Sequence, residues 1–574
     1  MKISLFVSIK LLVQTIKNYL VSFFSVLNSI SILSLIVLLF VEFAFNAVIV
    51  DTSFYFQLHQ IILHIIVLNL GVNLLFNTQP VIKQLVLKPF DTAILMVYFA
   101  HIFVPTFTLT FFLSQIFLVA VLIVKINCVK QLLNFFKVSP AKIIIFGFLF
   151  VIFIGSLLLS LPISSTGVTS LAFIDALFTS FSAVCVTGLT VNSVGEEFSF
   201  FGQIIILLLI QIGGLGIMSF SILTLLLMKQ KVSPSDSIRI QRSYTTYNLQ
   251  DSYSAIKFIF QFTLLFEVIG AILLAIVWHK PGVALSTTIF HSVFHSISAF
   301  CNAGFSLFSN SLVDYQFHLP TTVIISTLII LGGLGFPVLF NLYQRYFTNK
   351  NVPIKLQTSI ALKVTLFLIV FGTVMIFCTE SNYSFYGLSQ LEKWQLAFFQ
   401  SITARTAGFH TIDIGLFHPG SLLVIMILMI IGASPVSTGG GVKTTTFGLI
   451  VLGFWNILKT SYRFDYNKKT IHTESVFVAF ATLITAILLI GTVAFALFFT
   501  EFLPIDKIIF EVISAFGTVG LSLSATEHLS FVGKLYIIAI MFIGRIGPFV
   551  FFYTFFRKKQ KKSYAYPVEK VSIV

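Results

Sequence analysis

Long apolar stretches alternate with short polar breaks along this chain, and from residue 141 onward they form a recurring pattern. An apolar span is followed by a short amphipathic segment, a glycine-containing phrase and a second apolar span, and this order occurs four times. About 20 apolar residues suffice for a helix to cross a bilayer roughly 30 Å thick. The pattern therefore predicts a helical membrane protein built from four repeats.

The apolar spans set the predicted boundaries of the repeats. The first spans lie near 141–161, 256–278, 358–378 and 474–500, and the second spans near 200–228, 322–346, 421–458 and 530–556. The short segments between them, each too short to cross a bilayer, are 172–185, 287–301, 393–405 and 507–517. We expect each to be a helix that enters the membrane and turns back. The predicted units are 141–230, 255–347, 358–460 and 474–557, followed by a basic cytoplasmic tail, 558–574.

Charge fixes the orientation of the repeats. The net charge is +15, and basic residues gather after each second span, whereas residues 162–199 contain no Lys or Arg. Because Lys and Arg accumulate in cytoplasmic loops, all the short segments are predicted to lie on the outer side, and nucleic acid is not needed to explain the charge. The predicted fold is an all-α polytopic membrane protein with four parallel helix–pore-loop–helix repeats around one pore.

Residues 1–140 do not follow the repeat. They contain apolar runs at 21–50, 57–76 and 92–124, which predict extra N-terminal membrane helices of unknown role. The first run is too long for a cleaved signal sequence, so we expect it to be retained. Whether three crossings or a bent pair of short helices near Pro105 complete this region stays open.

The glycine phrases of the four repeats can be aligned on Gly188, Gly304, Gly408 and Gly520. Ten residues before the glycine each repeat has a phenylalanine, and two residues after it each has a polar residue. These phenylalanines are Phe178, Phe294, Phe398 and Phe510, and these polar residues are Thr190, Ser306, His410 and Ser522. A single such phrase is typical of close helix packing, but four copies after four short segments indicate a shared function.

A cation pore gives a chemical reason for the phrases. A dehydrated cation needs oxygen ligands in place of its water, and backbone carbonyls can supply them if glycine permits the required backbone angles. We therefore predict a K⁺ selectivity filter, with K⁺ there as the only metal ion. Its residues are Val186, Thr187, Gly188, Leu189, Asn302, Ala303, Gly304, Phe305, Thr406, Ala407, Gly408, Phe409, Thr518, Val519, Gly520 and Leu521.

The second spans contain a further glycine pattern, "IGGLGI" at 212–217, "LGGLGF" at 331–336 and "IGRIGP" at 543–548. In the third repeat the matching stretch, 434–446, has a proline and three successive glycines and cannot remain a regular helix. Arg545 aligns with Gly214 and Gly333, and an ionisable residue within a membrane span is a functional candidate. We predict a gate below the filter, although a kink with packing glycines is the alternative. Its residues are Ser434, Ser437, Thr438, Gly439, Gly440, Gly441, Lys443 and Arg545.

Together the four phrases, the "STGGGVKTTT" loop and the late arginine resemble the Trk/Ktr/HKT superfamily of potassium transporters, especially its bacterial TrkH/KtrB pore-forming subunits. The resemblance covers roughly 141–556. It implies potassium uptake, a multi-pass location in the cell (inner) membrane, a homodimer, and a cytosolic nucleotide-binding regulatory subunit of the TrkA/KtrA type. It also implies potassium preference, because sodium-preferring plant relatives carry Ser where this chain has Gly188.

Other classes of protein fit less well. We find no converging acid, base or metal set for an enzyme, no covalently bound cofactor motif, and no arginine-rich spans for a voltage-gated channel. Any nucleotide is expected on a partner subunit, because the chain has no nucleotide-binding fingerprint. A sodium-conducting or sodium/potassium-transporting relative of the same architecture is the main alternative. Arg405 is expected to support the filter, and Asp175 is either a helix N-terminal charge or a vestibule charge.

Overall fold

The computed structural model describes residues 140–167, 171–227, 249–282, 284–348, 352–459, 464–467, 469–548 and 551. The predicted N-terminal membrane helices, apart from residue 140, and the predicted basic tail lie outside these described residues. The account below concerns the compact unit formed by residues 139–160 and 164 onward.

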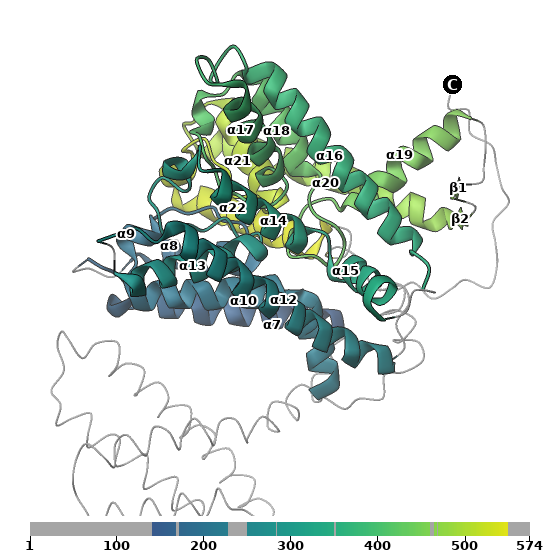
Figure 1. Cartoon of the computed structure of the whole chain (residues 1–574), viewed down its shortest axis with the longest axis horizontal. Helices are drawn as coiled ribbons and strands as arrows, with labels where there is room; N and C mark the ends of the chain where they lie inside the picture. Colours follow the sequence, from purple (N-terminus) through teal and green to yellow (C-terminus); the bar gives the residue numbers. More distant parts are fainter. Residues whose placement is uncertain are drawn as a thin grey trace, which may run out of the picture. The chain divides into compact units, whose positions relative to one another are not determined.

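Within the described residues the chain is helical except for one small hairpin (Figure 1). The first spans of the four repeats are α7 (Pro140–Leu159), α12 (Leu249–Trp278), α16 (Leu356–Glu380) and α20 (Thr473–Thr500). The four short helices are α8 (Phe173–Cys185), α13 (Leu285–Phe300), α17 (Gln390–Thr403) and α21 (Ile505–Gly517). The second spans are α10 (Phe200–Leu227), α14 (Leu319–Gly333) with α15 (Phe336–Tyr343), α18 (Pro419–Ile430) with α19 (Thr444–Leu458), and α22 (Phe531–Ile546).

Shorter elements connect these helices. The hairpin consists of β1 (Phe464–Tyr466) and β2 (Lys469–Ile471), which pair antiparallel with Phe464 opposite Ile471. The helical turns are η1 (Pro162–Ser164), α9 (Val194–Glu197), η2 (Val313–Tyr315), η3 (Gln344–Thr348), η4 (Ile414–Leu416) and η5 (Thr526–His528).

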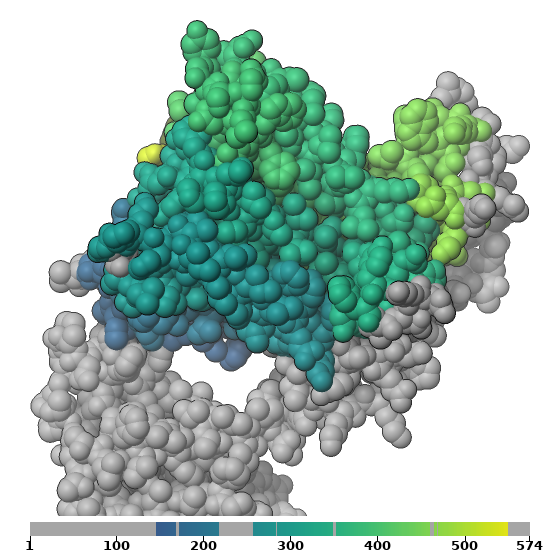
Figure 2. Space-filling model, viewed as in Figure 1, coloured from purple at the N-terminus to yellow at the C-terminus, as the bar shows by residue number. Residues whose placement is uncertain are grey.

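The exposed surface of the spans is apolar, as a lipid-facing surface requires. Three described helices are long and apolar enough to cross a membrane, and α14 with α15 makes a fourth candidate bent by 95°. On α12 the exposed side chains include Phe260, Leu264, Ile272 and Ile276. Figure 2 shows the side chains of the second and third repeats, teal to green, forming one continuous surface in this view. The chain is thus a helical, multi-pass membrane protein.

Each short helix packs against the first span of its own repeat, and large aromatic side chains fill the contacts. Phe178, Phe294 and Phe510 are fully buried, as expected for an aligned position. In the third repeat, however, Phe398 is 37% exposed and Phe399 is 1% exposed. The predicted alignment of Phe398 is therefore wrong by one residue. The physical reason is that the residue whose hydroxyl holds the loop, Thr403, lies five residues before Gly408, whereas its counterparts lie six residues before their glycines. The helical positions of the third repeat are therefore shifted by one residue, so that Phe399 takes the inward position.

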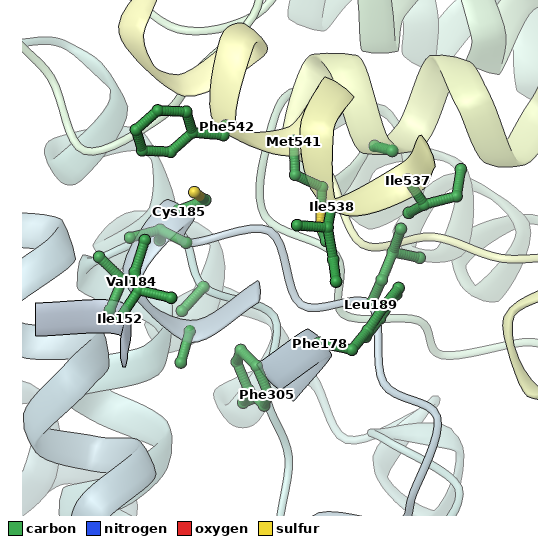
Figure 3. Close-up of a cluster of buried hydrophobic side chains, with 14 of the residues drawn as sticks. Ile152, Phe178, Val184, Cys185, Leu189, Phe305, Ile537, Ile538, Met541 and Phe542 are labelled. Carbon is green, nitrogen blue, oxygen red and sulfur yellow. The ribbon is translucent and has the colours of Figure 1, made fainter. Parts of the chain in front are cut away.

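A core of buried apolar side chains surrounds the first short helix (Figure 3). Phe178 and Val184 of α8 lie in the same cluster as Ile537 and Met541 of α22, which belongs to the fourth repeat. Phe305, from the second repeat, lies in the same cluster. The core of the first repeat is therefore built partly by its neighbours.

The second spans break more often than the sequence predicted. We predicted a break in the third, but α10 also has a non-helical residue at Gly216, and α14 ends before Gly335. Gly216, Gly335 and Gly547 share a φ between 86° and 96°, a left-handed backbone that glycine adopts without steric cost. The last glycine of each "GxxG" spacing is therefore the break point. In the third repeat the break is a loop of residues 431–443, because α18 ends at Ile430 and α19 begins at Thr444. The loop thus begins and ends three residues earlier than the predicted stretch, 434–446.

Candidate functional site

The four glycine phrases form loops of one shape, called here the glycine loops (186–189, 302–305, 406–409 and 518–521). In each loop the aligned glycine has a φ between 71° and 92°. The residue two positions before the glycine also has a positive φ, between 50° and 74°. Those residues are Val186, Asn302, Thr406 and Thr518, none of them glycine, so each loop holds strain of about 1–3 kcal/mol at that position.

The glycine loops close into a ring. A Cβ added to Gly188 would collide with the backbone oxygen of Ala303, in the next repeat. The same relation joins Gly304 to Ala407, Gly408 to Val519, and Gly520 back to Thr187. The order around the ring is therefore repeat 1, 2, 3, 4 and 1 again. At each junction a glycine is required by its backbone angle and also by the nearness of a neighbouring carbonyl.

Hydroxyl groups on the short helices hold the glycine loops in place, and the sequence reading missed them. Ser182 and Ser514 each accept a hydrogen bond from the N–H of their own loop glycine at 3.1 Å. Ser298 donates to the oxygen of Phe305 at 2.8 Å, and Thr403 donates to that of Phe409 at 2.5 Å. Their spacing from the glycine, six residues in three repeats and five in the third, is the signal that could have revealed them.

The side chains beside the loop glycines are buried in protein. Thr187, Ala303, Ala407 and Val519 precede the glycines, and Leu189, Phe305, Phe409 and Leu521 follow them, and all eight are at most 1% exposed. The structure brings all the predicted filter residues into this one ring. Among the described residues no group of three or more His, Cys, Asp or Glu side chains could hold a metal ion. What the ring offers a cation is therefore backbone oxygen.

The 431–443 loop has internal hydrogen bonds and is also hydrogen-bonded to the second repeat. Ile431 and Val442 form a parallel bridge, and the N–H of Gly432 donates to the oxygen of Val442 at 2.9 Å. The N–H of Ser434 donates to the oxygen of Gly333 at 3.0 Å, at the break between α14 and α15. The Ser434 hydroxyl also contacts that of Thr444 at 2.8 Å. Two broken spans thus satisfy each other's free backbone groups.

The glycines of this loop lie directly against the glycine loops. A Cβ on Gly439 would collide with the hydroxyl of Thr406, and one on Gly440 with that of Thr518. The N–H of Gly440 donates to the Thr518 hydroxyl at 2.9 Å. Thr406 and Thr518 are the left-handed residues two positions before their loop glycines. The 431–443 loop therefore touches the start of the third and fourth glycine loops.

Arg545 joins this loop to the first repeat. Its guanidinium donates to the backbone oxygens of Thr438 and Gly213, and the residue is 7% exposed. Lys443 donates to the oxygen of Gly439 at 2.7 Å. Of the remaining predicted gate residues, Ser437 and Thr438 have buried hydroxyls with no hydrogen-bond partner in the described structure, and Gly441 has a φ of 66°. The structure thus brings the predicted gate residues together.

The glycines before Arg545 and its counterparts have a packing role. A Cβ on Gly213, Gly332 or Gly544 would collide with a backbone oxygen near the end of its own short helix. These oxygens belong to Val184, Phe300 and Phe516. The contact agrees with the alignment of Arg545 with Gly214 and Gly333, since each follows one of these glycines.

Two charged residues outside the ring also have defined contacts. Arg405 donates to the oxygen of Thr365 in α16 at 3.3 Å, and so it points toward the first span of its repeat. Asp175, in the first turn of α8, forms an ion pair with Lys534 of α22 at 2.5 Å. The first contact joins the end of the third short helix to α16, and the role of Arg405 in supporting the filter stays a prediction. The second contact links the first repeat to the fourth.

These features define a class of protein: a helical membrane protein with four repeats whose glycine loops meet in a ring of backbone oxygens. Residues 140–566 match the family model described as TrkH, cation transport protein. The chain belongs to this family, which transports cations and is not a family of enzymes.

Similar proteins agree with this assignment. The chain is 37% identical to the "Ktr system potassium uptake protein B" of Bacillus subtilis, over 76% of this chain and 97% of that protein. It is also 37% identical to the "Potassium/sodium uptake protein NtpJ" of Enterococcus hirae, over 76% of this chain and 98% of that protein. The crystal structure of the potassium transporter TrkH from Vibrio parahaemolyticus matches with a TM-score of 0.58 and 19% identity, covering 71% of this chain and 84% of that one. The last match supports the fold.

Proposed function

We propose that this protein takes up potassium ions across the cell (inner) membrane, with the ring of glycine loops as its selectivity filter. The main observation in support is that each loop glycine faces a backbone oxygen of the next repeat. Four such junctions supply oxygens in a closed ring, which is what a cation stripped of water needs. The name of the Bacillus subtilis relative, a potassium uptake protein, supports the choice of ion.

The short helices support the same proposal. The helices α8, α13, α17 and α21 end one to three residues before the first residue of their glycine loops, so their C-terminal ends lie next to the ring. The C-terminal end of a helix has a partial negative charge, which favours a cation. Neither contribution needs an acidic side chain in the ring.

Purified protein in liposomes tests this proposal. With K⁺ inside and Na⁺ outside, the reversal potential should follow the K⁺ gradient. A reversal potential near zero under equal opposing gradients would show that the ring does not discriminate between the two ions, and the potassium-selective filter would be refuted.

A sodium/potassium transporter is the second candidate, and a specific observation favours it. The Enterococcus hirae relative, as similar as the Bacillus subtilis one, is named a potassium/sodium uptake protein. The two candidates differ in one measurement. Na⁺ added to both sides at constant K⁺ should leave K⁺ flux unchanged in a selective filter, whereas a carrier of both ions will show Na⁺ flux of its own.

We also propose that the 431–443 loop is the gate, held closed by Arg545 and Lys443. The support is that both cations donate hydrogen bonds to loop carbonyls, and that the loop glycines touch Thr406 and Thr518 beside the filter. Deleting Gly439–Gly441 should raise K⁺ flux, because the segment in contact with the filter is removed. A K⁺ flux equal to that of the parent protein, at matched protein amounts, would contradict the gate and favour the alternative of a simple kink.

Finally, we propose that the protein works as a homodimer with a cytosolic nucleotide-binding subunit of the TrkA/KtrA type. The support is family membership together with the basic segments after the second spans. Affinity purification from native membranes in mild detergent should recover a soluble nucleotide-binding protein, and light scattering should give twice the mass of one chain. Repeated recovery of a bare monomer would contradict both parts.

A further inference from the structure

The four short helices carry a second aligned polar position, three residues before the hydroxyls that hold the glycine loops. The residues at this position are Thr179, His295, Gln400 and Glu511. All four are buried, between 0% and 1% exposed. The residues two positions after the loop glycines, Thr190, Ser306, His410 and Ser522, are the available partners for them. The question is which of these pairs is joined.

In the fourth repeat the pair is joined. The Ser522 hydroxyl donates to Glu511 Oε2 at 2.7 Å, and the Thr526 hydroxyl donates to Oε1 of the same carboxyl group. The oxygen of Ser522 also accepts from the N–H of Ala525 at 3.2 Å. The side chain of one helical residue thus holds both the end of its glycine loop and the turn that follows.

The second repeat has the same arrangement with different chemistry. His295 Nδ1 lies 2.8 Å from the backbone oxygen of His291, and its Nε2 lies 3.0 Å from the Ser306 hydroxyl. A carbonyl can only accept, so Nδ1 carries the proton, and in a neutral ring Nε2 accepts from the Ser306 hydroxyl. The Ser306 hydroxyl also lies 3.4 Å from the backbone oxygen of Ser311, a longer contact for its proton. Ser306 in turn accepts from the N–H of Phe308 at 3.0 Å. His295 therefore plays the part of Glu511.

The first and third repeats lack this bond. The hydroxyl of Thr179 and both amide atoms of Gln400 are buried without a hydrogen-bond partner among the described residues. Because the ring order is 1, 2, 3, 4, the joined pairs occupy opposite corners of the ring and the unjoined pairs the other two corners. The loop ends at two opposite corners are therefore fixed to their helices, and those at the other two are not fixed in this way.

We propose that Glu511 and His295 are positioning residues for ion selection, each fixing the outer end of a glycine loop through the hydroxyl of Ser522 or Ser306. The inference rests on the proposed filter function. On this proposal, the second and fourth repeats make the ring rigid, and so keep its backbone oxygens at one spacing. A ring whose corners can widen accepts ions of more than one size.

The test compares Glu511→Ala and His295→Ala with the conservative changes Glu511→Gln and His295→Gln in liposomes. The alanine variants should lower the K⁺/Na⁺ permeability ratio by about threefold to tenfold, the effect of losing the one hydrogen bond that reaches the end of the glycine loop. The glutamine variants should keep most of the ratio, because an amide can still bond a hydroxyl. Ser522→Ala and Ser306→Ala break the same bonds from the other side, and they serve if the alanine variants at 511 or 295 do not fold.

Thr179→Val is the matched control, because it occupies the same helical position and removes a hydroxyl that has no partner. It should leave the ratio unchanged. An unchanged ratio in both serine variants, with a selective parent protein, overturns the proposal while the filter function stands. If the parent protein does not select K⁺, the filter proposal fails instead. In that case the bonds of Glu511 and His295 are tested by the half-saturation concentration of the transported cation. This concentration must change in Glu511→Ala and His295→Ala and stay the same in Thr179→Val.

Discussion

The ring of glycine loops and the 431–443 loop are both non-helical backbone among the spans, but they are built in opposite ways. The ring repeats one junction four times, and each junction is a glycine pressed against a carbonyl of the next repeat. The 431–443 loop occurs once, and it is held by Arg545 and Thr518 from other parts of the chain and by Lys443 of the loop itself. Repetition gives the ring the same contact at all four junctions, whereas the loop depends on single contacts, each of which one substitution can remove.

The largest expected effect comes from breaking a junction of the ring. In Gly188→Ser a Cβ meets the backbone oxygen of Ala303 at a φ of 87°, so both the loop and its neighbour must move. The K⁺/Na⁺ permeability ratio should fall by at least about tenfold, the equivalent of roughly 1.4 kcal/mol. Gly304→Ser, which faces Ala407, should behave in the same way. Reversal potentials in liposomes measure both.

Gly387→Ser is the control for this prediction. Gly387 has a φ of 84°, but nothing lies within 4 Å of its added Cβ. It therefore has the same backbone cost without the collision. Should Gly188→Ser and Gly387→Ser give the same ratio as the parent protein, close approach of the glycines would not control selectivity.

A second effect, on K⁺ flux and not on the permeability ratio, is expected from releasing the loop. Arg545→Ala removes the donors to Thr438 and Gly213, and a hydrogen bond to a charged group is worth about 1.5–3 kcal/mol. K⁺ flux should rise roughly tenfold or more if this bond holds the closed state. Flux is measured by ⁸⁶Rb⁺ uptake at matched amounts of folded protein. Arg545→Lys, which keeps one charge, should be intermediate, and a flux below that of the parent protein in both variants would contradict the gate.

The sequence predicted most of the ring and little of what supports it. The apolar spans and the four aligned glycines identified the repeats, because both depend on local composition. The third short helix was misaligned because Phe398 and Phe399 are adjacent, and only packing shows that Phe399 is the buried one. The residues two positions before the glycines gave little signal either. Asn302 is of a type enriched at positive φ, but Val186, Thr406 and Thr518 are not.

The 431–443 loop shows a different limit of the sequence. Pro435 and the three glycines predicted a break, but its partners come from α14, the fourth glycine loop and α22, which are distant in the chain. Likewise, His295 and Glu511 could be found by their offset from the glycines, but the bonds to Ser306 and Ser522 required the loops to be placed. The pattern of apolar and glycine positions in one sequence does not show which residues of different repeats are in contact.

The smallest expected effect tests the one hydrogen bond that joins the two regions. Thr518 belongs to the fourth glycine loop, and its hydroxyl accepts from the N–H of Gly440 in the 431–443 loop at 2.9 Å. Thr518→Val keeps the shape and removes the acceptor, at a cost of about 0.5–1.5 kcal/mol. Because valine retains the branched side chain, the left-handed backbone at residue 518 is unchanged in steric terms. K⁺ flux should therefore rise by roughly twofold to tenfold, while the permeability ratio stays near that of the parent protein. A fall in the ratio without a rise in flux would mean that this bond serves the ring instead, and that the two regions are not separate in function.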